Sequence, residues 1–148
     1  MKELVNNWIR RAESDFKIGK DELDTEGPVT DAICFHMQQC AEKYLKAYLT
    51  HHNKYFRKTH DIDELIGLCK EIDKDFEALY QLNAGKLNRY AVDIRYPDDF
   101  YMPTIEEADE CVKIATDVKN FVKAKLKKLD KPVNEGSRNE NYSSNPGI

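Results

Sequence analysis

The stretch Cys34-Phe-His-Met-Gln-Gln-Cys-Ala-Glu-Lys-Tyr-Leu-Lys-Ala-Tyr-Leu49 decides the fold of this chain. Its apolar residues recur at intervals of three and four, which is the period of an amphipathic α-helix. One face carries Ile33, Met37, Cys40, Tyr44, Ala47 and Tyr48, and Ala41, Leu45 and Leu49 widen it. A helix with so broad an apolar face contacts neighbours on two sides. We therefore expect it at the centre of a helical bundle.

Four further helical segments surround this one in the sequence, and almost nothing alternates with the period of a strand. The pattern predicts helices over about 3–24, 30–52, 61–72, 74–94 and from 104 to about 130. Gly27-Pro28 ends the first helix, because proline cannot continue it. Asp61 or Thr59 can cap the third helix, and Thr104-x-x-Glu107 forms a capping box for the fifth. The predicted fold is all-α, an antiparallel up-and-down bundle of four long helices and a short one.

Composition sets the size and class of the protein. The 148 residues suit one domain with its own core, which we place at residues 1–130, followed by a polar tail at 131–148 that is too poor in apolar groups to order itself. The net charge of −4 argues against broad coating of nucleic acid, so RNA is a partner that the charge does not support. A local basic pocket remains compatible with this charge.

Cysteine spacing and hydropathy indicate a cytoplasmic protein. The four cysteines at 34, 40, 69 and 111 form no Cys-x-x-Cys pair and lie among apolar neighbours, as buried reduced thiols do. No apolar run approaches the roughly 20 residues that span a bilayer, so we expect no membrane association. The sequence holds no Gly-rich phosphate loop and no metal-binding motif, so we predict neither a cofactor nor a metal.

Three motifs together resemble a known family. The central helix carries Gln39-Cys-Ala-Glu-Lys-Tyr-Leu-Lys-Ala47, Lys58-Thr-His-Asp-Ile-Asp-Glu-Leu65 follows it, and Arg95-Tyr-Pro-Asp98 comes about thirty residues later. The chain resembles HEPN domains in these motifs, over roughly residues 3–130. The resemblance implies a small all-helical domain that binds a nucleotide. It also implies a nucleotidyltransferase-like partner protein, as in toxin–antitoxin systems.

Ribonucleases of the wider HEPN superfamily resemble one another in an Arg followed after four to six residues by His. No arginine precedes any of the four histidines, His36, His51, His52 and His60, at that distance. The ribonuclease mechanism therefore does not transfer to this chain residue by residue. We assign no catalytic residue and favour a protein that is not an enzyme; a ribonuclease with a non-standard site is the third interpretation.

A cluster of cations is the candidate binding site. Short connections make consecutive helices antiparallel, which would place the end of the second helix beside the start of the third. We predict that this cationic pole binds a nucleotide or another phosphate-bearing ligand, helped by the free amides at the start of the third helix. The candidate ligand-binding residues are Lys46, Arg57, Lys58, His60 and Arg95.

Each of these residues also has a structural interpretation. His60 can be a helix-start residue with its ring packed on a tyrosine, and Arg95 can pair with a nearby aspartate. Glu42 and Lys46 stand four apart, so we expect a solvent-facing ion pair. The alternative function is a homodimeric interaction module without a small-molecule ligand. The two functions differ in whether the cations are free or neutralised by the chain's own acids.

Overall fold

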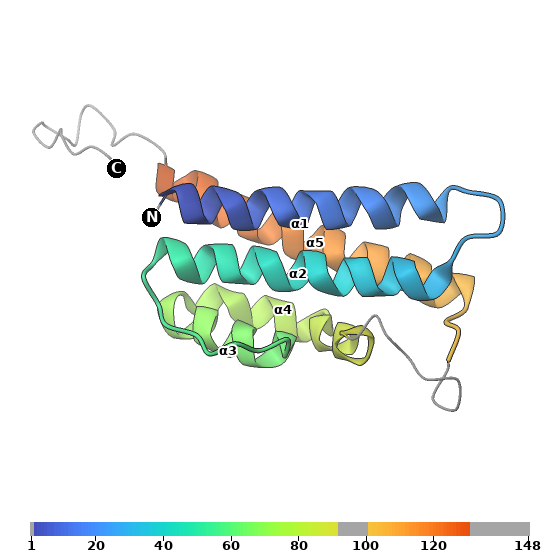
Figure 1. The fold of residues 1–148 in the computed structure, drawn as a ribbon. Coiled ribbons are helices and arrows are strands. Elements are labelled where there is room, and N and C mark those ends of the chain that lie inside the picture. The colour runs from blue at the N-terminus through green and yellow to red at the C-terminus, as the bar shows by residue number, and fades with distance from the viewer. Residues whose placement is uncertain (1, 92–100, 131–148) are drawn as a thin grey trace, which may run out of the picture.

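The structure, a computed structural model, describes residues 2–91 and 101–130. Five α-helices and two 3₁₀ helices form these parts of the chain, and they contain no strand (Figure 1). The predicted all-α bundle is confirmed. The elements are α1 (Lys2–Leu23), α2 (Thr30–His51), α3 (Ile62–Ile72), η1 (Lys74–Phe76), α4 (Glu77–Gln81), η2 (Ala84–Tyr90) and α5 (Ile105–Asp130).

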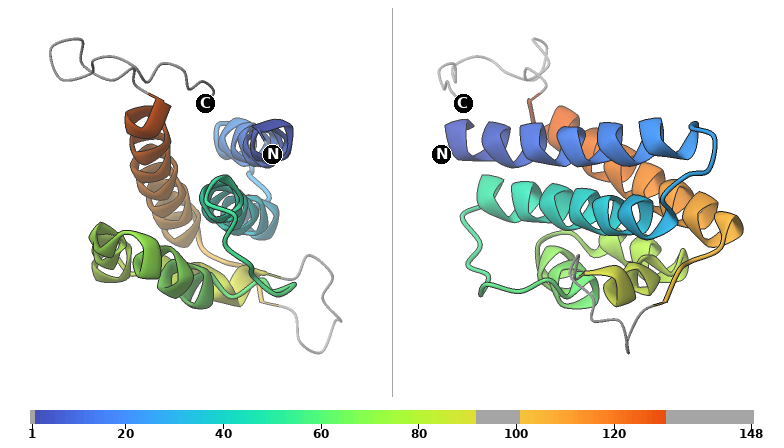
Figure 2. Two further views of the ribbon diagram at one scale, coloured as in Figure 1. Left: turned by 90° about the vertical axis from the view of Figure 1, so that its left-hand side faces the viewer. Right: turned by 45° about the vertical axis from the view of Figure 1, so that its right-hand side comes forward.

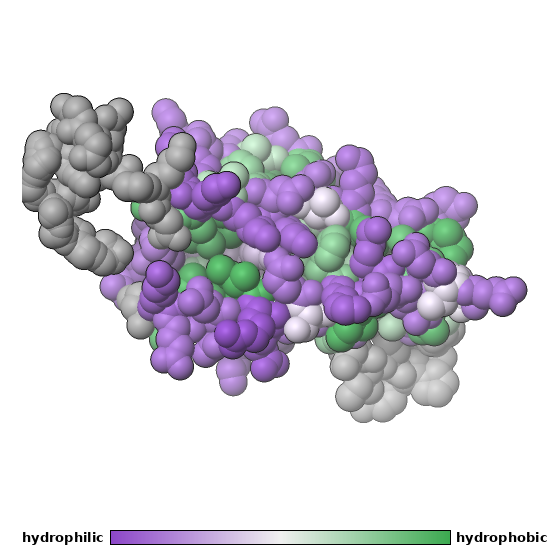
Figure 3. All heavy atoms as spheres, turned by 90° about the horizontal axis from the view of Figure 1, so that it is seen from above, coloured by the Kyte–Doolittle hydropathy of each residue, from purple (hydrophilic) through white to green (hydrophobic). Residues whose placement is uncertain are grey.

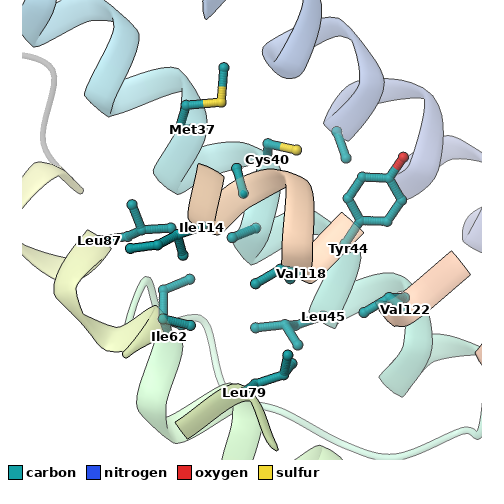
Figure 4. Close-up of a cluster of buried hydrophobic side chains, with 14 of the residues drawn as sticks. Met37, Cys40, Tyr44, Leu45, Ile62, Leu79, Leu87, Ile114, Val118 and Val122 are labelled. Atoms are coloured by element: carbon teal, nitrogen blue, oxygen red, sulfur yellow. The ribbon is translucent and has the colours of Figure 1, made fainter. Parts of the chain in front are cut away.

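Helix α2 lies at the centre of the bundle, as its broad apolar face predicts. It contacts α1 and α5 along its length and α3 and η2 on another side (Figure 2). Fourteen of its 22 residues are buried, so little of the helix reaches solvent. Figure 4 shows Met37, Cys40 and Leu45 of α2 among core side chains from α3, α4, η2 and α5. All four cysteines are buried and free.

Two of the predicted caps are present. The Asp61 side chain accepts a hydrogen bond from the Glu64 amide at 3.2 Å, at the start of α3. At the start of α5 the Glu107 amide donates to Thr104 Oγ1 at 3.0 Å, and the Thr104 amide donates to Glu107 Oε1 at 2.9 Å. This reciprocal pair is the predicted capping box. It fixes where the longest helix begins.

The predicted fourth helix is broken into shorter pieces. Asn83 adopts a left-handed conformation with φ 60°, which ends α4 and allows η2 to start in a new direction. A left-handed residue cannot lie inside a right-handed helix. The side chains of Phe76, Leu79 and Leu87, which belong to the apolar pattern of this segment, are nevertheless buried. Periodicity therefore predicted the buried face correctly and missed the turn.

The connection after α2 differs from the short antiparallel turn that we expected. Residues 52–61 run back along α2, so that the His60 carbonyl accepts a hydrogen bond from Gln38 Nε2 at 3.0 Å in the first half of that helix. The end of α3 then lies near the end of α2, where Lys54 pairs with Glu71. Helix α3 thus runs in the same direction as α2. The start of α3 therefore does not lie beside the end of α2, where the cationic pole was expected.

Three further expectations concern the ends of the chain and the membrane. Leu4 and Leu129, which continue the apolar patterns of α1 and α5 towards the ends of these helices, are exposed. The motif Arg95–Asp98 and the predicted tail at 131–148 lie outside the described residues. No helix within the described ranges has the length and apolar character that crossing a bilayer requires.

Candidate functional site

A buried carboxylate organises the polar groups of α2. The side chain of Glu42 is only 4% exposed, and it accepts from Lys46 Nζ at 2.7 Å through Oε2. Its other oxygen, Oε1, lies 2.9 Å from Nδ1 of His60, which the returning connection brings against the helix. A charge removed from water in this way must be compensated by partners. Glu42 is therefore the centre of a cluster that we call the Glu42 cluster: Gln38, Gln39, Glu42, Lys46 and His60.

Two glutamines complete the Glu42 cluster. Gln38, fully buried, donates from Nε2 both to Glu42 Oε1 at 3.2 Å and to the His60 carbonyl. Gln39 donates to Glu42 Oε1 at 3.3 Å and to Gln38 Oε1 at 2.7 Å. Gln38 thus holds the backbone of His60 while Glu42 holds its ring. The position of His60 is fixed from two sides.

Lys46 is enclosed by aromatic rings as well as by its carboxylate. Its Nζ lies 5.6 Å from the centroid of the Trp8 ring and 5.7 Å from that of Phe56. These rings come from α1 and from the connection after α2, and their centroids are 6.4 Å apart. The side chain of Lys46 is 7% exposed. The expected solvent-facing pair of Glu42 and Lys46 is therefore wrong, because the returning connection covers it.

His60 is the most exposed member of the Glu42 cluster. Its side chain is 60% exposed although its partner Glu42 is buried. Since an ionised carboxylate can only accept a hydrogen bond, Nδ1 of His60 carries the proton and donates the hydrogen bond to Glu42. This leaves Nε2 to accept a proton, or to donate to an anion when the ring is charged. The arrangement resembles the way in which a carboxylate orients a histidine for proton transfer.

Of the other predicted ligand residues, Arg57 is bound to a carboxylate and Lys58 is exposed. Arg57 forms a two-pronged pair with Glu64, with Nε and Nη2 at 2.8 and 2.7 Å from the carboxylate oxygens, and this pair raises the pKa of Arg57. Lys58 is exposed and has no ion-pair partner in the part of the chain that is described. Arg95 lies outside the described residues. The structure thus brings Lys46 and His60 together, because both contact the carboxylate of Glu42.

Two of the amides at the start of α3, which were expected to help hold an anion, already have partners. The Ile62 amide donates to Asn88 Oδ1 at 2.7 Å, and Asp61 caps the Glu64 amide. Asp63 adds a further carboxylate there, and burial raises its pKa, with Asp61 adding to the rise. An anion at this terminus would meet the carboxylates of Asp61 and Asp63.

A second polar cluster joins α1 to α2. Asp15, itself buried, lies 2.8 Å from Nδ1 of His36 and accepts from Lys43 Nζ at 2.6 Å. Two residues earlier on α1, Glu13 accepts from the hydroxyl of the buried Tyr44. Sequence reasoning missed Asp15 as a partner of His36 and Lys43, and it paired Glu42 with Lys46 but not with His60. The available signal was a carboxylate on an otherwise apolar helix face, which requires a cation nearby.

Comparison with known proteins decides the family. The HEPN domain model matches residues 5–126, which is most of the chain. The chain belongs to the HEPN family. A relative from Methanocaldococcus jannaschii, named "Putative toxin MJ1304", is 32% identical in an alignment of 134 residues that covers 81% of this chain and 86% of the relative. The resemblance read from the three sequence motifs is thereby confirmed.

Two solved structures resemble this HEPN protein. The crystal structure of ST0689, an archaeal HEPN homologue, has a TM-score of 0.62 at 29% identity, and the match covers 82% of this chain and 97% of that one. The crystal structure of TT1696 from Thermus thermophilus has a TM-score of 0.64 at 26% identity and covers 82% and 98%. The fold of the HEPN chain therefore extends over nearly the whole of both structures.

Proposed function

We propose that this HEPN protein is the helical component of a toxin–antitoxin-type pair, and that it acts by binding a partner protein. The family resemblance points to a nucleotidyltransferase-like protein as that partner. The relative from M. jannaschii that carries the name of a toxin supports the assignment to such a pair. Its alignment extends over most of both chains, so the likeness is not limited to one motif.

One observation carries the choice of a protein partner over a nucleotide. Among the predicted ligand residues that are described, Lys46 and His60 are bound to Glu42, and Arg57 is bound to Glu64. A phosphate would have to displace these carboxylates, one of which is buried. Breaking a buried pair leaves an uncompensated charge and is costly. The neutralised cations therefore support a protein partner over a nucleotide ligand.

Co-expression tests this proposal. Affinity-tagged nucleotidyltransferase-like proteins from the same genome would each be produced together with this untagged chain. We expect one of them to retain the chain through affinity and size-exclusion steps at a fixed stoichiometry. Retention at 0.5 M salt would separate a specific complex from weak charge attraction, since the Debye length falls to a few ångströms. The proposal fails if none of these proteins retains the chain.

A second candidate function, contact with a phosphate group, is supported by the exposed ring of His60. His60 Nε2 is directed away from the Glu42 bond, and Lys58, two residues earlier, is exposed and unpaired within the described ranges. A protonated imidazole and an ammonium can each donate to a phosphate oxygen. Arg95 remains in this candidate as the sequence predicted it.

Thermal-shift measurements with ATP, GTP, their monophosphates and short RNA test the phosphate candidate. A rise in Tm that is lost in Lys58→Ala and His60→Ala would support it, because ligand bound to the native state stabilises that state. Lys127→Ala, which removes another exposed lysine, is the matched control and should keep the rise. Cleavage of RNA that survives repurification and disappears in His60→Ala would instead favour a ribonuclease. An unchanged Tm with every ligand removes the phosphate candidate.

A further inference from the structure

One end of the bundle exposes a group of large apolar side chains. Val29 precedes α2, and Tyr101, Met102 and Ile105 surround the start of α5; each is between 43% and 48% exposed. The Thr30 hydroxyl donates to the Pro103 carbonyl at 2.6 Å, which holds the two segments together. Figure 1 shows the α1–α2 connection and the start of α5 at the same end of the molecule. We call the exposed group of Val29, Tyr101, Met102 and Ile105 the apolar end.

The surroundings of the apolar end are strongly acidic. Segments 21–31 and 101–110 contain nine acidic side chains and no lysine or arginine. Glu107 and Glu110 pair with cations of η2, but Glu26, Glu106 and Asp109 have no ion-pair partner among the described residues. Figure 3 shows apolar atoms among hydrophilic ones at this end, seen from above. The result is an apolar group with a mainly acidic border, in which Arg89 lies 5.1 Å from the centroid of the Tyr101 ring and pairs with Glu107.

The negative charge of this border limits which classes of partner can bind to the apolar end. Nucleic acids and anionic lipid surfaces carry negative charge and are repelled. Two copies of this chain joined through the same end would place acid against acid, so a two-fold dimer there is unfavourable. A surface with apolar side chains and a border of lysine or arginine is complementary in both respects. Such complementarity is typical of the centre and rim of a protein interface.

We propose that the apolar end is the docking surface for the partner protein, and that the partner presents a basic surface with apolar anchors. This inference rests on the proposed function, since it names the surface through which the pair forms. The apolar side chains provide the binding energy, because the centre of an interface contributes most of it. The carboxylates mainly steer the encounter and select the partner's charge.

Two synthetic amphipathic helical peptides test the chemistry of the surface without the partner. A Leu/Lys peptide should shift the NMR signals of backbone amides in residues 21–31 and 101–110, and a Leu/Glu peptide should not. The double variant Met102→Ser/Ile105→Ser should weaken binding of the Leu/Lys peptide by at least about tenfold. Leu4→Ser/Leu129→Ser removes two exposed leucines from the opposite end and should keep the affinity within about twofold. Equal responses to both peptides, or shifts at the opposite end, would overturn the inference.

The co-expression assay then separates this inference from the proposed function. If wild type and Met102→Ser/Ile105→Ser are retained equally by the partner, the docking surface is wrong while the proposed pair stands. If no partner retains wild type but the peptide shifts are localised as expected, the proposed pair fails and the surface chemistry stands. Sedimentation of the chain alone provides a third outcome. Self-association that this double variant abolishes would assign the apolar end to a second copy and overturn the inference.

Discussion

The carboxylate of Glu42 lies 2.7 Å from the ammonium of Lys46 in the interior of the protein, where their side chains are 4% and 7% exposed. On the sequence these two residues have the spacing of an ordinary surface pair on a helix. The difference comes from the connection between α2 and α3, which places Phe56 and His60 over them. A buried pair and a surface pair respond very differently to mutation, which makes the arrangement testable.

Lys46→Met should destabilise the protein by about 3 kcal/mol, because it leaves Glu42 as a buried carboxylate without its cation. Urea denaturation followed by circular dichroism measures this change. The control is Lys17→Met, which removes an exposed lysine that also pairs four residues along its helix, with Asp21. The control should not change stability measurably. Equal effects of the two variants would show that the Glu42–Lys46 pair is not buried.

The ring of His60 should be held in a single tautomer when neutral, with the proton on Nδ1. Glu42 enforces this choice because an ionised carboxylate accepts only. Nitrogen-15 NMR of the histidine rings distinguishes the two tautomers directly. Glu42→Gln replaces the carboxylate by an amide that can also donate, so the preference should decrease. Retention of the full preference in Glu42→Gln would contradict the role given to this carboxylate.

Thr104→Ala should cost about 1 kcal/mol of stability, because it removes the side-chain cap of α5. Thr104→Ser keeps the hydroxyl and should retain most of that stability. Thermal and urea denaturation of the three proteins provide the comparison. A loss in Thr104→Ser as large as that in Thr104→Ala would mean that the methyl group, not the hydrogen bond, matters at this position.

Stability should fall as the pH is lowered from 7 to 5, in part through His52. Burial is the main cause that lowers the pKa of His52, and the neighbouring His51 adds to it; the Nε2 of His52 is buried without a partner. The unfolded chain therefore binds more protons than the folded one below the ordinary value of 6.5. The stability that neutral His52 contributes to the folded state is present above pH 6.5 and is lost as the pH falls towards the lowered pKa of the folded state.

The variant His52→Phe measures this contribution, since phenylalanine can keep the contact with Tyr48, whose ring centroid is 4.5 Å away. Urea midpoints between pH 5 and 7 should change less in His52→Phe than in wild type. His51→Asn retains the imidazole of His52 and should keep most of the dependence of stability on pH. If His52→Phe and wild type lose equal stability over this range, the buried imidazole is not responsible.

The fold was largely predictable because its signals are local. The 3.6-residue period of α2 gave the centre of the bundle, and the hydroxyl and carboxylate of Thr104 and Glu107 gave the start of α5. Caps and helix faces depend on residues within a few positions of each other. The break at Asn83 was missed, since a single left-handed residue leaves the apolar period on both sides nearly intact.

The sequence by itself thus determined the long helices, most of their buried faces and the membership of the HEPN family. Only the tertiary structure decided which charges meet. The path of residues 52–61 brought His60 to Glu42 and not to the end of α2, and the packing of α1 on α2 brought Asp15 to His36 and Lys43. These partners are 18 to 28 positions apart in the chain. Periodicity carries no information about such contacts, because they depend on the direction of each connection.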